Sequence, residues 1–454
     1  MSTAVRAVAP VTGPLDATVR PPGSKSLTNR ALVCAALAPG RSVLDGALFA
    51  EDTEAMLDAL RTLGVGLDTD PTAARVVVHG LGGRLPDGDH VLDARLSGTT
   101  SRFLLPLVAL GPGRYRLDGA PPLRSRPMAD GIAAVRALGA TVVEEGEPGH
   151  LPVVVHGAAV PPGGDPGAAA AALTVPGSAS SQFVSGLLLS GPAWPGGLRL
   201  TTPGRLVSRP YVDMAVAVMR SFGAFVEPVD TPGGTGWVAA PGGYRAAHHT
   251  VEPDASAASY FVAAAAICGG RVTIEGLGRH ALQGDVAFVD VLERMGCRVE
   301  GGDDATTVES TEALHGVDVD MSDISDTAQT LAAVAVFADS PTRVRGIGFI
   351  RGKETDRIGD VVRELRRCGI EADEEADGFV VRPGMPRPAR VATYEDHRMA
   401  MSFALVGLRV PGIEIADPGC VAKTFPGFWD ALDALRPPAD GASGPRAAPA
   451  GTRG

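Results

Sequence analysis

The hydrophobic and polar positions of this chain repeat one arrangement five times. An amphipathic helix end is followed by a glycine, and then by a small or branched residue that opens a strand. Glycine adopts the positive φ of a helix C-terminus at little cost, so each copy predicts a helix that leads directly into a strand. The five copies read ALRTLGVGLD, AVRALGATVV, AVMRSFGAFVE, VLERMGCRVE and ELRRCGIEAD, with Gly64, Gly139, Gly223, Gly296 and Gly369 as their glycines.

The spacing of these glycines is nearly constant, at 75, 84, 73 and 73 residues. Such self-similarity predicts one α/β unit repeated along the chain. Chance is the alternative, because helix–glycine–strand connections are common in α/β proteins. A sixth helix is expected at 428–436, but Pro437 and Pro438 prevent a strand from following it. The N-terminal run AVRAVAP could supply the missing strand and so join the two ends of the chain.

Six units divide three and three, which predicts two α/β domains. We place the crossings between them near Pro22 and near Pro253. This gives a discontinuous domain of residues 1–22 and 252–437, which contains both termini, and an inserted domain of residues 23–251.

The composition is that of a globular protein with many short connections, since 45% of residues are hydrophobic and there are 58 Gly and 37 Pro. Five widely separated cysteines show no metal or disulfide spacing, which favours a reducing compartment. The longest apolar stretches, such as 261–268, are far shorter than the roughly 20 residues that span a membrane. The N-terminus also lacks the apolar core of a secretory signal. We therefore expect a cytoplasmic monomer with no membrane partner.

Two further features of the composition bear on nucleic-acid binding and on disorder at the C-terminus. The formal net charge of -11 opposes nonspecific binding to nucleic acid, although it allows a local basic pocket. Residues 438–454 are rich in proline, glycine and alanine and are expected to form a disordered tail.

Basic side chains lie at the expected helix entrances of this acidic chain. Backbone N–H groups at a helix start favour an anion, and lysine and arginine add charge-assisted hydrogen bonds of roughly 1.5–3 kcal/mol each. If the entrances meet in one cleft between the domains, that cleft would hold two anionic substrates side by side. The cations are Lys25, Arg30, Arg126, Arg357, Arg398 and Lys423.

Polar and acidic residues lie at the same junctions. Hydroxyl and amide groups suit a phosphate or a polyol, and acids could serve proton transfer. Helix capping and solvated ion pairs are the alternative interpretation of each position taken alone. The candidates are Ser26, Gly98, Ser180, Ser181, Gln182, Asp326, Lys353 and Glu354.

A series of motifs through nearly the whole chain resembles the enolpyruvyl transferases, and among them the 3-phosphoshikimate 1-carboxyvinyltransferases. In order they are PGSKSLTNR, SGTTSR, RPM, SSQF, VSRPY, PDASAASYF, SDTAQT, GKETDRI, DHRMAM and KTFPGF. The resemblance implies two domains, each of three βαβαββ units around a pseudo-threefold axis, in the arrangement of an inside-out α/β barrel. It implies no metal and no organic cofactor.

The resemblance also implies the reaction and the roles of individual residues. An enolpyruvyl group would pass from phosphoenolpyruvate to the 5-hydroxyl of shikimate 3-phosphate by addition and elimination. Asp326 would accept the hydroxyl proton, and Glu354 would serve proton transfer at the methylene carbon, with Lys25 as a third catalytic residue. Shikimate 3-phosphate would contact Lys25, Ser26, Arg30, Ser180, Ser181, Ser208 and Lys353, and phosphoenolpyruvate would contact Lys25, Gly98, Arg126, Gln182, Arg357, Arg398 and Lys423.

Three positions depart from the family pattern. Leu96 and Phe349 replace asparagines found in some members, and Arg209 replaces a common lysine. The first two changes remove polar contacts. The alternative that this protein is an enolpyruvyl transferase acting on a different alcohol therefore stays open. Gly98 and the SSQF motif resemble the glyphosate-sensitive form.

Three other functions are less compatible with the sequence. The related enzyme that acts on UDP-N-acetylglucosamine would carry a cysteine where this chain reads LRSRPM. A noncatalytic anion-binding relative would be expected to lose Asp326, Glu354 or one of the cations, and all are present. An RNA-end-processing relative is disfavoured by the net acidity.

Overall fold

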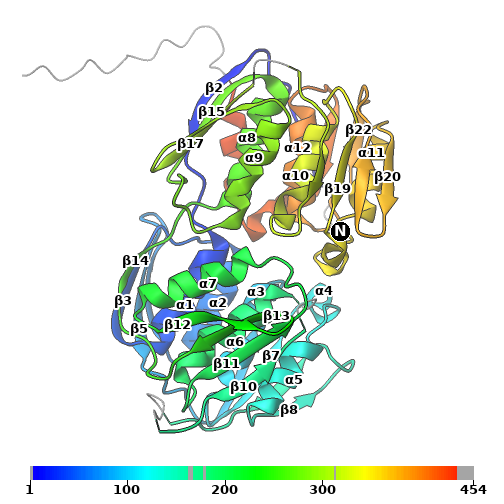
Figure 1. The fold of residues 1–454 in the computed structure, drawn as a ribbon. Helices are drawn as coiled ribbons and strands as arrows, with labels where there is room; N and C mark the ends of the chain where they lie inside the picture. Colours follow the sequence, from blue (N-terminus) through cyan, green and yellow to red (C-terminus); the bar gives the residue numbers. More distant parts are fainter. Residues whose placement is uncertain (1–3, 162–166, 177–179, 311–312, 437–454) are drawn as a thin grey trace, which may run out of the picture.

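The computed structural model describes residues 4–161, 167–176, 180–310 and 313–436. The tail predicted to be disordered, 438–454, lies outside the described residues. Two halves are visible, joined where the chain crosses twice between them (Figure 1).

Each complete unit has the order βαβαββ and forms one four-stranded sheet. Its first strand runs parallel to the second, the second runs antiparallel to the fourth, and the third pairs with the fourth alone. The second unit is β6 (Asp89–Asp93), α3 (Gly98–Val108), β7 (Arg114–Asp118), α4 (Pro121–Arg124), α5 (Ala129–Ala137), β8 (Thr141–Glu144) and β9 (Val153–His156).

The other two units of the same half follow this plan. The first takes its parallel strand, β14, from more than 160 residues further along the chain, because β14 pairs with β3. It consists of α1 (Lys25–Leu37), β3 (Pro39–Asp45), α2 (Glu51–Thr62), β4 (Gly66–Asp70), β5 (Arg75–Leu81) and β14 (His248–Thr250). The third is β10 (Ala171–Thr174), α6 (Ser181–Ser190), η1 (Gly191–Ala193), β11 (Leu198–Pro203), α7 (Pro210–Ser221), β12 (Val226–Thr231) and β13 (Gly234–Ala239).

The other half contains β2, which pairs in parallel with β15. Its first unit is β2 (Leu15–Val19), α8 (Ala255–Cys268), β15 (Gly270–Glu275), η2 (Gly284–Ala287), α9 (Phe288–Arg294), β16 (Arg298–Gly301) and β17 (Ala305–Ser310). Its second is β18 (Asp318–Asp320), η3 (Ser325–Thr327), α10 (Ala328–Ala335), β19 (Thr342–Arg345), η4 (Gly348–Gly352), α11 (Gly359–Arg367), β20 (Ala372–Glu375) and β21 (Gly378–Val381).

The sixth unit is completed by the N-terminus, as the sequence suggested. Strand β1 pairs antiparallel with β23, and Val5 lies opposite Ala416. The last helix is shorter than the predicted 428–436, because the chain after Asp433 continues in turns with i to i−3 hydrogen bonds. The unit comprises β22 (Ala389–Val391), α12 (His397–Gly407), β23 (Ile413–Ala416), η5 (Pro418–Lys423), α13 (Phe428–Asp433) and β1 (Val5–Ala7).

The five repeated glycines end helices α2, α5, α7, α9 and α11 with positive φ values between 78° and 106°. At the first of them the N–H of Val65 donates to the carbonyl oxygen of Leu60 at 3.0 Å, which is the hydrogen bond of a Schellman motif. The interpretation of the repeat as helix, glycine and strand is confirmed.

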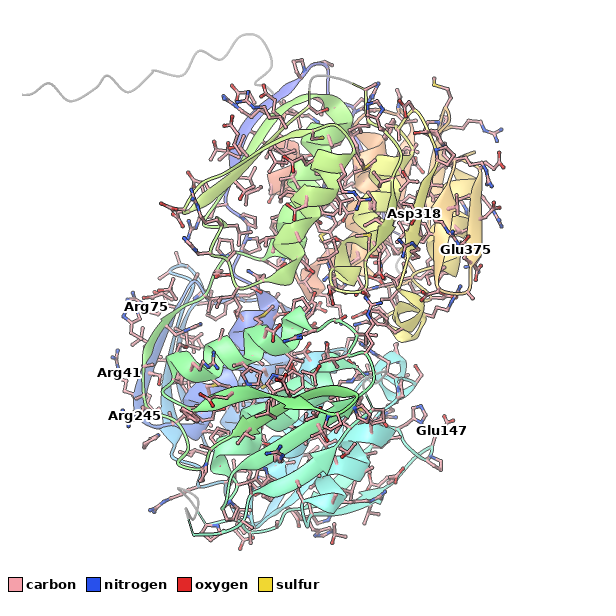
Figure 2. The ribbon with its side chains drawn as sticks, viewed as in Figure 1. Arg41, Arg75, Glu147, Arg245, Asp318 and Glu375 are labelled. Atoms are coloured by element: carbon pink, nitrogen blue, oxygen red, sulfur yellow. The ribbon has the colours of Figure 1, made fainter. Side chains whose placement is uncertain are left out.

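Each half encloses its own core. One hydrophobic cluster extends from Leu27 to Val251, and the other combines Val8 and Leu15 with residues from Ala255 onward. The central helices of each half are buried on every side, as α3 and α12 are along their whole length. The sheets lie outside them, and charged side chains such as Arg41, Arg75 and Asp318 project outward (Figure 2).

The two crossing segments pair with each other between these cores. Gly23 and Pro253 form an isolated antiparallel bridge, and the N–H of Ser24 donates to the Glu252 carbonyl oxygen at 2.8 Å. This pairing supports our proposal that residues 23–251 form one domain and residues 1–22 and 252–437 the other. No helix within the described ranges is long and apolar enough to cross a membrane.

Close packing of β5 on α1 makes Gly80 sensitive to substitution. A Cβ atom at Gly80 would overlap the carbonyl oxygens of Ala35 and Ala38, which are backbone atoms and cannot move independently. We expect Gly80→Ala to lower the free energy of unfolding by about 1–3 kcal/mol, measured by urea denaturation. Gly301→Ala is the control, because no atom lies within 4 Å of its Cβ position, and equal stability of the two variants would contradict the prediction.

Candidate active site

The two halves face each other across a narrow region (Figure 1). Candidate functional side chains from both halves line one small cavity there. The starts of α1, α3 and α6 come from one half, and η3, η5 and the start of α12 come from the other. A small central cavity of about 20 Å³ lies among them, which is room for about one water molecule. It is lined by Lys25, Asp52, Gly98, Thr99, Arg126, Gln182, Asp326, Lys353, Glu354, Arg357 and Arg398.

Two lysines from opposite halves share one carboxylate. Asp52, which is 3% exposed, lies 3.2 Å from Nζ of Lys25 and 3.1 Å from Nζ of Lys423. Lys423 also donates to the carbonyl oxygen of Leu96 at 2.8 Å and lies 3.5 Å from Glu354. These contacts join the two halves through buried ion pairs.

Arg357 is the centre of a second network and is 2% exposed. Its guanidinium binds Asp396 through Nε and Nη2, at 2.7 and 3.2 Å. It also lies 3.2 Å from Asp326 and 2.8 Å from Glu354. Arg398 donates to the other oxygen of Asp326 at 2.7 Å. The two candidate acid–base residues are therefore held by the same arginine.

Both candidate carboxylates are ionised at neutral pH in this arrangement. Burial opposes the charge on Asp326, but Arg398, Lys353 and Arg357 outweigh burial and hold its pKa well below the usual range. The pKa of Glu354 is likewise well below its usual range, because burial is outweighed by Arg357, Arg126 and Lys423.

At Lys353, unlike at the two carboxylates, burial is the effect that decides the pKa. Burial lowers its pKa to about 8, although the charge of Asp326 partly restores it.

A larger cavity, of about 280 Å³, lies beside the central one. Ser180 caps α6, since its Oγ accepts from the N–H of Gln182 at 3.4 Å. Ser208 has a positive φ of 54° and donates from Oγ to the Ser322 carbonyl oxygen across the two halves, at 3.3 Å. We call this space the serine cavity; it is lined by Arg102, Arg126, Pro127, Asp130, Ser180, Ser181, Phe183, Val207, Ser208, Phe349, Gly352 and Lys353.

Gln182 lies between the two spaces. Its Oε1 accepts from Arg102 at 2.6 Å, and its Nε2 donates to the hydroxyl of Thr99 at 3.2 Å. Burial lowers the pKa of Arg102 to about 9, and the nearby Arg126 lowers it further. Gln182 therefore already has partners from α3 on one side of the site.

Arg30 is placed differently from the other cations. It is 1% exposed and does not line the central or the serine cavity. Its guanidinium donates to the carbonyl oxygens of Ser26 and Tyr211, both at 2.8 Å, and to the Ser185 hydroxyl at 3.2 Å. Arg30 thus holds Ser26 and the start of α7 in place, and its contact with a ligand stays a prediction. Arg124, another arginine before a helix, pairs with Asp118 at the surface.

Sequence reasoning did not identify several residues of the site. Asp52 is an acid in the first turn of α2, which reads as an ordinary complement to the helix dipole. Tyr211 ends the VSRPY motif but was given no role, and Asp285 lies outside all of the motifs. In the described part of the chain, no group of three or more His, Cys, Asp or Glu residues could hold a metal ion.

Comparison with known proteins agrees with this geometry. The sequence pattern of the family described as EPSP synthase (3-phosphoshikimate 1-carboxyvinyltransferase) matches residues 10–432. This chain belongs to the EPSP synthase family. A protein of Nostoc punctiforme named 3-phosphoshikimate 1-carboxyvinyltransferase is 47% identical over 416 residues, which cover 92% of this chain and 95% of that protein.

Solved structures show the same fold. An EPSP synthase from Acinetobacter baumannii matches 95% of this chain and 98% of its own, with a TM-score of 0.78 and 26% identity. The enolpyruvyl transferase NikO from Streptomyces tendae, at 21% identity, has a TM-score of 0.69 over 95% of this chain and 97% of its own. The predicted two-domain fold of the enolpyruvyl transferases is confirmed.

The three departures from the EPSP synthase pattern take different places. Leu96 contributes its carbonyl oxygen to Lys423, a contact that any side chain permits. Phe349 lines the serine cavity. Arg209 lies 3.5 Å from Asp213, and both side chains are about half exposed. Leu96 also lines a small space together with Arg126, Glu354 and Lys423. Leu96 and Phe349 therefore both change the surface of a space beside the candidate site.

Proposed function

We propose that this EPSP synthase family member transfers the enolpyruvyl group of phosphoenolpyruvate to the 5-hydroxyl of shikimate 3-phosphate and releases phosphate. The observation that carries the proposal is the meeting of Lys25, Arg126, Arg357, Arg398 and Lys423 around two carboxylates between the halves. Two multiply charged anions bound together require such a set of cations.

The predicted ligand contacts fit the two spaces. Phosphoenolpyruvate would occupy the central cavity, where Gly98 and Gln182 complete the wall that the cations begin. Shikimate 3-phosphate would extend toward the serine cavity, where hydroxyls and Lys353 suit its phosphate. The residues proposed for it are Lys25, Ser26, Arg30, Ser180, Ser181, Ser208 and Lys353.

The chemistry needs one acid and one base at the same time. Protonation of C3 by Glu354 makes C2 cation-like, and the 5-oxygen attacks C2 while Asp326 takes the hydroxyl proton. In the elimination, C3 returns a proton to Glu354, the C2–O bond to phosphate breaks, and the leaving phosphate takes the proton that Asp326 received. Arg357 lies within 3.2 Å of both carboxylates, so it holds the acid and the base in one geometry.

Substrate binding itself would prepare Glu354 as an acid. Without substrate, Arg357, Arg126 and Lys423 neutralise its carboxylate and lower its pKa. The carboxylate and phosphate of phosphoenolpyruvate compete for the same cations. Their binding therefore weakens the stabilisation of ionised Glu354 and raises its pKa toward the value that a proton donor needs at neutral pH.

We infer that the halves separate before substrates enter the central cavity. About 20 Å³ is too little for any substrate, and ion pairs such as Lys423 with Asp52 close the gap. Closing again around bound substrates would exclude the water that competes for the cation-like C2.

A backbone position beside Arg126 is expected to control phosphoenolpyruvate binding. A Cβ atom at Gly98 would lie 2.8 Å from Nη1 and 2.9 Å from Cζ of Arg126, so the guanidinium must shift. We expect Gly98→Ala to raise KM for phosphoenolpyruvate roughly tenfold, which corresponds to about 1.4 kcal/mol. Gly13→Ala is the control, because its Cβ position is open, and an unchanged KM in Gly98→Ala would contradict the prediction.

The function is tested by inorganic phosphate release from phosphoenolpyruvate with shikimate 3-phosphate, and with UDP-N-acetylglucosamine as the alternative acceptor. We expect saturable release with shikimate 3-phosphate alone. Release only with the other acceptor, or with neither, would refute the proposal. Addition of glyphosate is expected to inhibit release, since the absence of a side chain at Gly98 lets the guanidinium of Arg126 keep its position.

We further propose that the protein acts as a monomer in the cytoplasm, without nucleic-acid or membrane partners. One chain supplies residues from both sides of the site, so the proposed chemistry needs no second copy. The five cysteines are all free thiols, which fits a reducing compartment.

A further inference from the structure

The hydroxyl of Tyr211 lies between two buried carboxylates. Its oxygen is 3.1 Å from Oδ2 of Asp285 and 3.3 Å from Oδ2 of Asp326. A phenol has one hydrogen and can donate to only one carboxylate at a time. The second contact is favourable only if that carboxylate is protonated and donates to the phenol oxygen. Both contacts are hydrogen bonds only if one of the two acids holds a proton.

The surroundings identify Asp285 as the protonated acid. Asp326 faces Arg398 and Arg357, at 2.7 and 3.2 Å, and is stabilised as an anion. Asp285 is 4% exposed, forms no ion pair with any described residue, and its Oδ1 has no hydrogen-bond partner. Burying a charge without a partner is costly, so the neutral acid is favoured.

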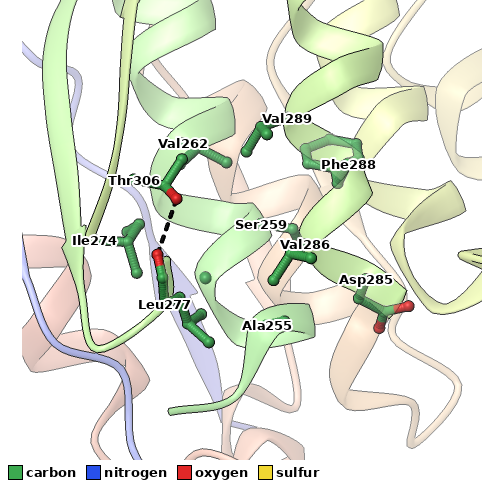
Figure 3. A pocket seen from close by; sticks show the side chains of 11 residues that line it. Ala255, Ser259, Val262, Ile274, Leu277, Asp285, Val286, Phe288, Val289 and Thr306 are labelled. Atoms are coloured by element: carbon green, nitrogen blue, oxygen red, sulfur yellow. Dashed lines mark hydrogen bonds between the residues drawn. The ribbon is translucent and has the colours of Figure 1, made fainter. Parts of the chain in front are cut away.

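A mainly apolar pocket lies beside Asp285 (Figure 3). Val286, Phe288 and Leu277 line this space, and Asp285 lies at its edge. Four charged or titratable groups face Asp285 from the neighbouring elements: Tyr211 of α7, Asp254 at the start of α8, Asp326 of η3 and Arg398 of α12.

Burial, together with the nearby carboxylates of Asp326 and Asp254, raises the pKa of Asp285 to about 7. Arg398 and the hydroxyl of Ser256, which donates to Oδ2, act in the opposite direction.

We propose that Asp285 is a positioning residue for Asp326: its carboxylic acid donates to the oxygen of Tyr211, and Tyr211 in turn donates its hydrogen to Oδ2 of Asp326. This inference rests on the proposed role of Asp326 as proton acceptor. This series of two hydrogen bonds keeps a second negative charge away from Asp326 and fixes the Asp326 carboxylate between Arg357 and Arg398. The hydroxyl proton of the substrate goes to Asp326, and Asp285 keeps its own proton throughout.

The sign of the pH effect follows from this arrangement. Above its pKa, Asp285 ionises, the hydrogen of Tyr211 can turn toward it, and a second negative charge faces Asp326. The rate constant kcat/KM therefore falls as pH rises through the pKa of Asp285. Lys353, with its pKa of about 8, gives a separate decline at higher pH.

Two substitutions should move the first decline in a defined direction. Asp285→Asn keeps a donor toward Tyr211 at every pH, so only the decline from Lys353 remains and the midpoint shifts upward by about one pH unit. Ser256→Ala removes a hydrogen bond that stabilises ionised Asp285, so its midpoint also shifts upward. Tyr211→Phe removes the hydroxyl that joins Asp285 to Asp326, so it should lower kcat at all pH values.

The experiment measures kcat/KM against pH for the wild type, Asp285→Asn, Ser256→Ala and the control Asp290→Asn, an exposed acid on the neighbouring helix. We expect Asp285→Asn to stay within about threefold of the wild type at pH 6 and both test variants to shift upward, while Asp290→Asn follows the wild type. Profiles that superimpose for all four proteins would overturn the proposal.

A second readout does not depend on turnover. The infrared difference spectrum between wild type and Asp285→Asn at pH 6 should contain the carbonyl stretch of a protonated carboxylic acid, which disappears on raising the pH. Absence of this band would overturn the proposal even if the enzyme is active. Presence of the band in a protein that releases no phosphate would refute the proposed function and leave the protonated chain established.

Discussion

Replacement of Asp326 by asparagine should reduce kcat for phosphate release by about 10²–10⁴-fold, the usual contribution of a positioned general base. The amide keeps the shape of the carboxylate but cannot accept the hydroxyl proton. Binding of phosphoenolpyruvate should not weaken, because Arg398 and Arg357 lose a competing anion at 2.7 and 3.2 Å. Initial rates at saturating concentrations of both substrates measure the effect.

Asp323→Asn is the matched control for this variant. Asp323 is exposed, three residues earlier in the same segment, and outside the central cavity. It should retain wild-type kcat. If Asp326→Asn kept kcat within tenfold of the wild type, Asp326 could not be the principal proton acceptor.

Arg357→Met should be damaging in two separate measurements. Methionine fills much of the same volume, but it leaves Asp396, Asp326 and Glu354 without the guanidinium that contacts all three. Removing one partner of a buried ion pair typically costs about 3–5 kcal/mol, which urea denaturation would register. Phosphate release should fall by at least the factor expected for Asp326→Asn, since the acid and the base lose their common support.

Arg363→Met separates this effect from the general loss of an arginine. Arg363 lies on α11 a few residues further along and outside the central cavity; its side chain is 57% exposed and pairs with Asp360, whose side chain is 9% exposed. Loss of an ion pair with one exposed partner should lower stability less than loss of Arg357, and activity should remain near that of the wild type. Equal losses in both variants would show that the buried network is not responsible.

The repeated units of the fold could be predicted from local pattern alone. Positive φ at Gly64 and its four counterparts depends on residues within one turn, so sequence is sufficient to indicate it. Strands that complete a unit from a distant part of the sequence are harder to predict. The pairing of β1 with β23 was suggested by a missing element, whereas the pairing of β14 with β3 left no comparable gap in the sequence.

The site shows the same division between local and distant causes. Lys25 and Arg398 each lie in the first turn of a helix. The local sequence was therefore enough to predict that their side chains could bind an anion. The partner of a cation depends on packing between the halves, which explains why Asp52 was not recognised. Arg30 looked like its neighbours in sequence, but it points into the protein interior and supports Ser26 instead of lining the cavities.

The closure of the sixth sheet by β1 also sets an order of events during synthesis. Arg6 pairs with Asp433, a residue 427 positions later, so the first strand to leave the ribosome waits for nearly the last. At the usual elongation rate of about 5–20 residues per second, that delay is roughly 20–90 s. The half with residues 27–251 in its core has all its strands well before then. Translation thus completes one half while the other still waits with its first two strands unpaired.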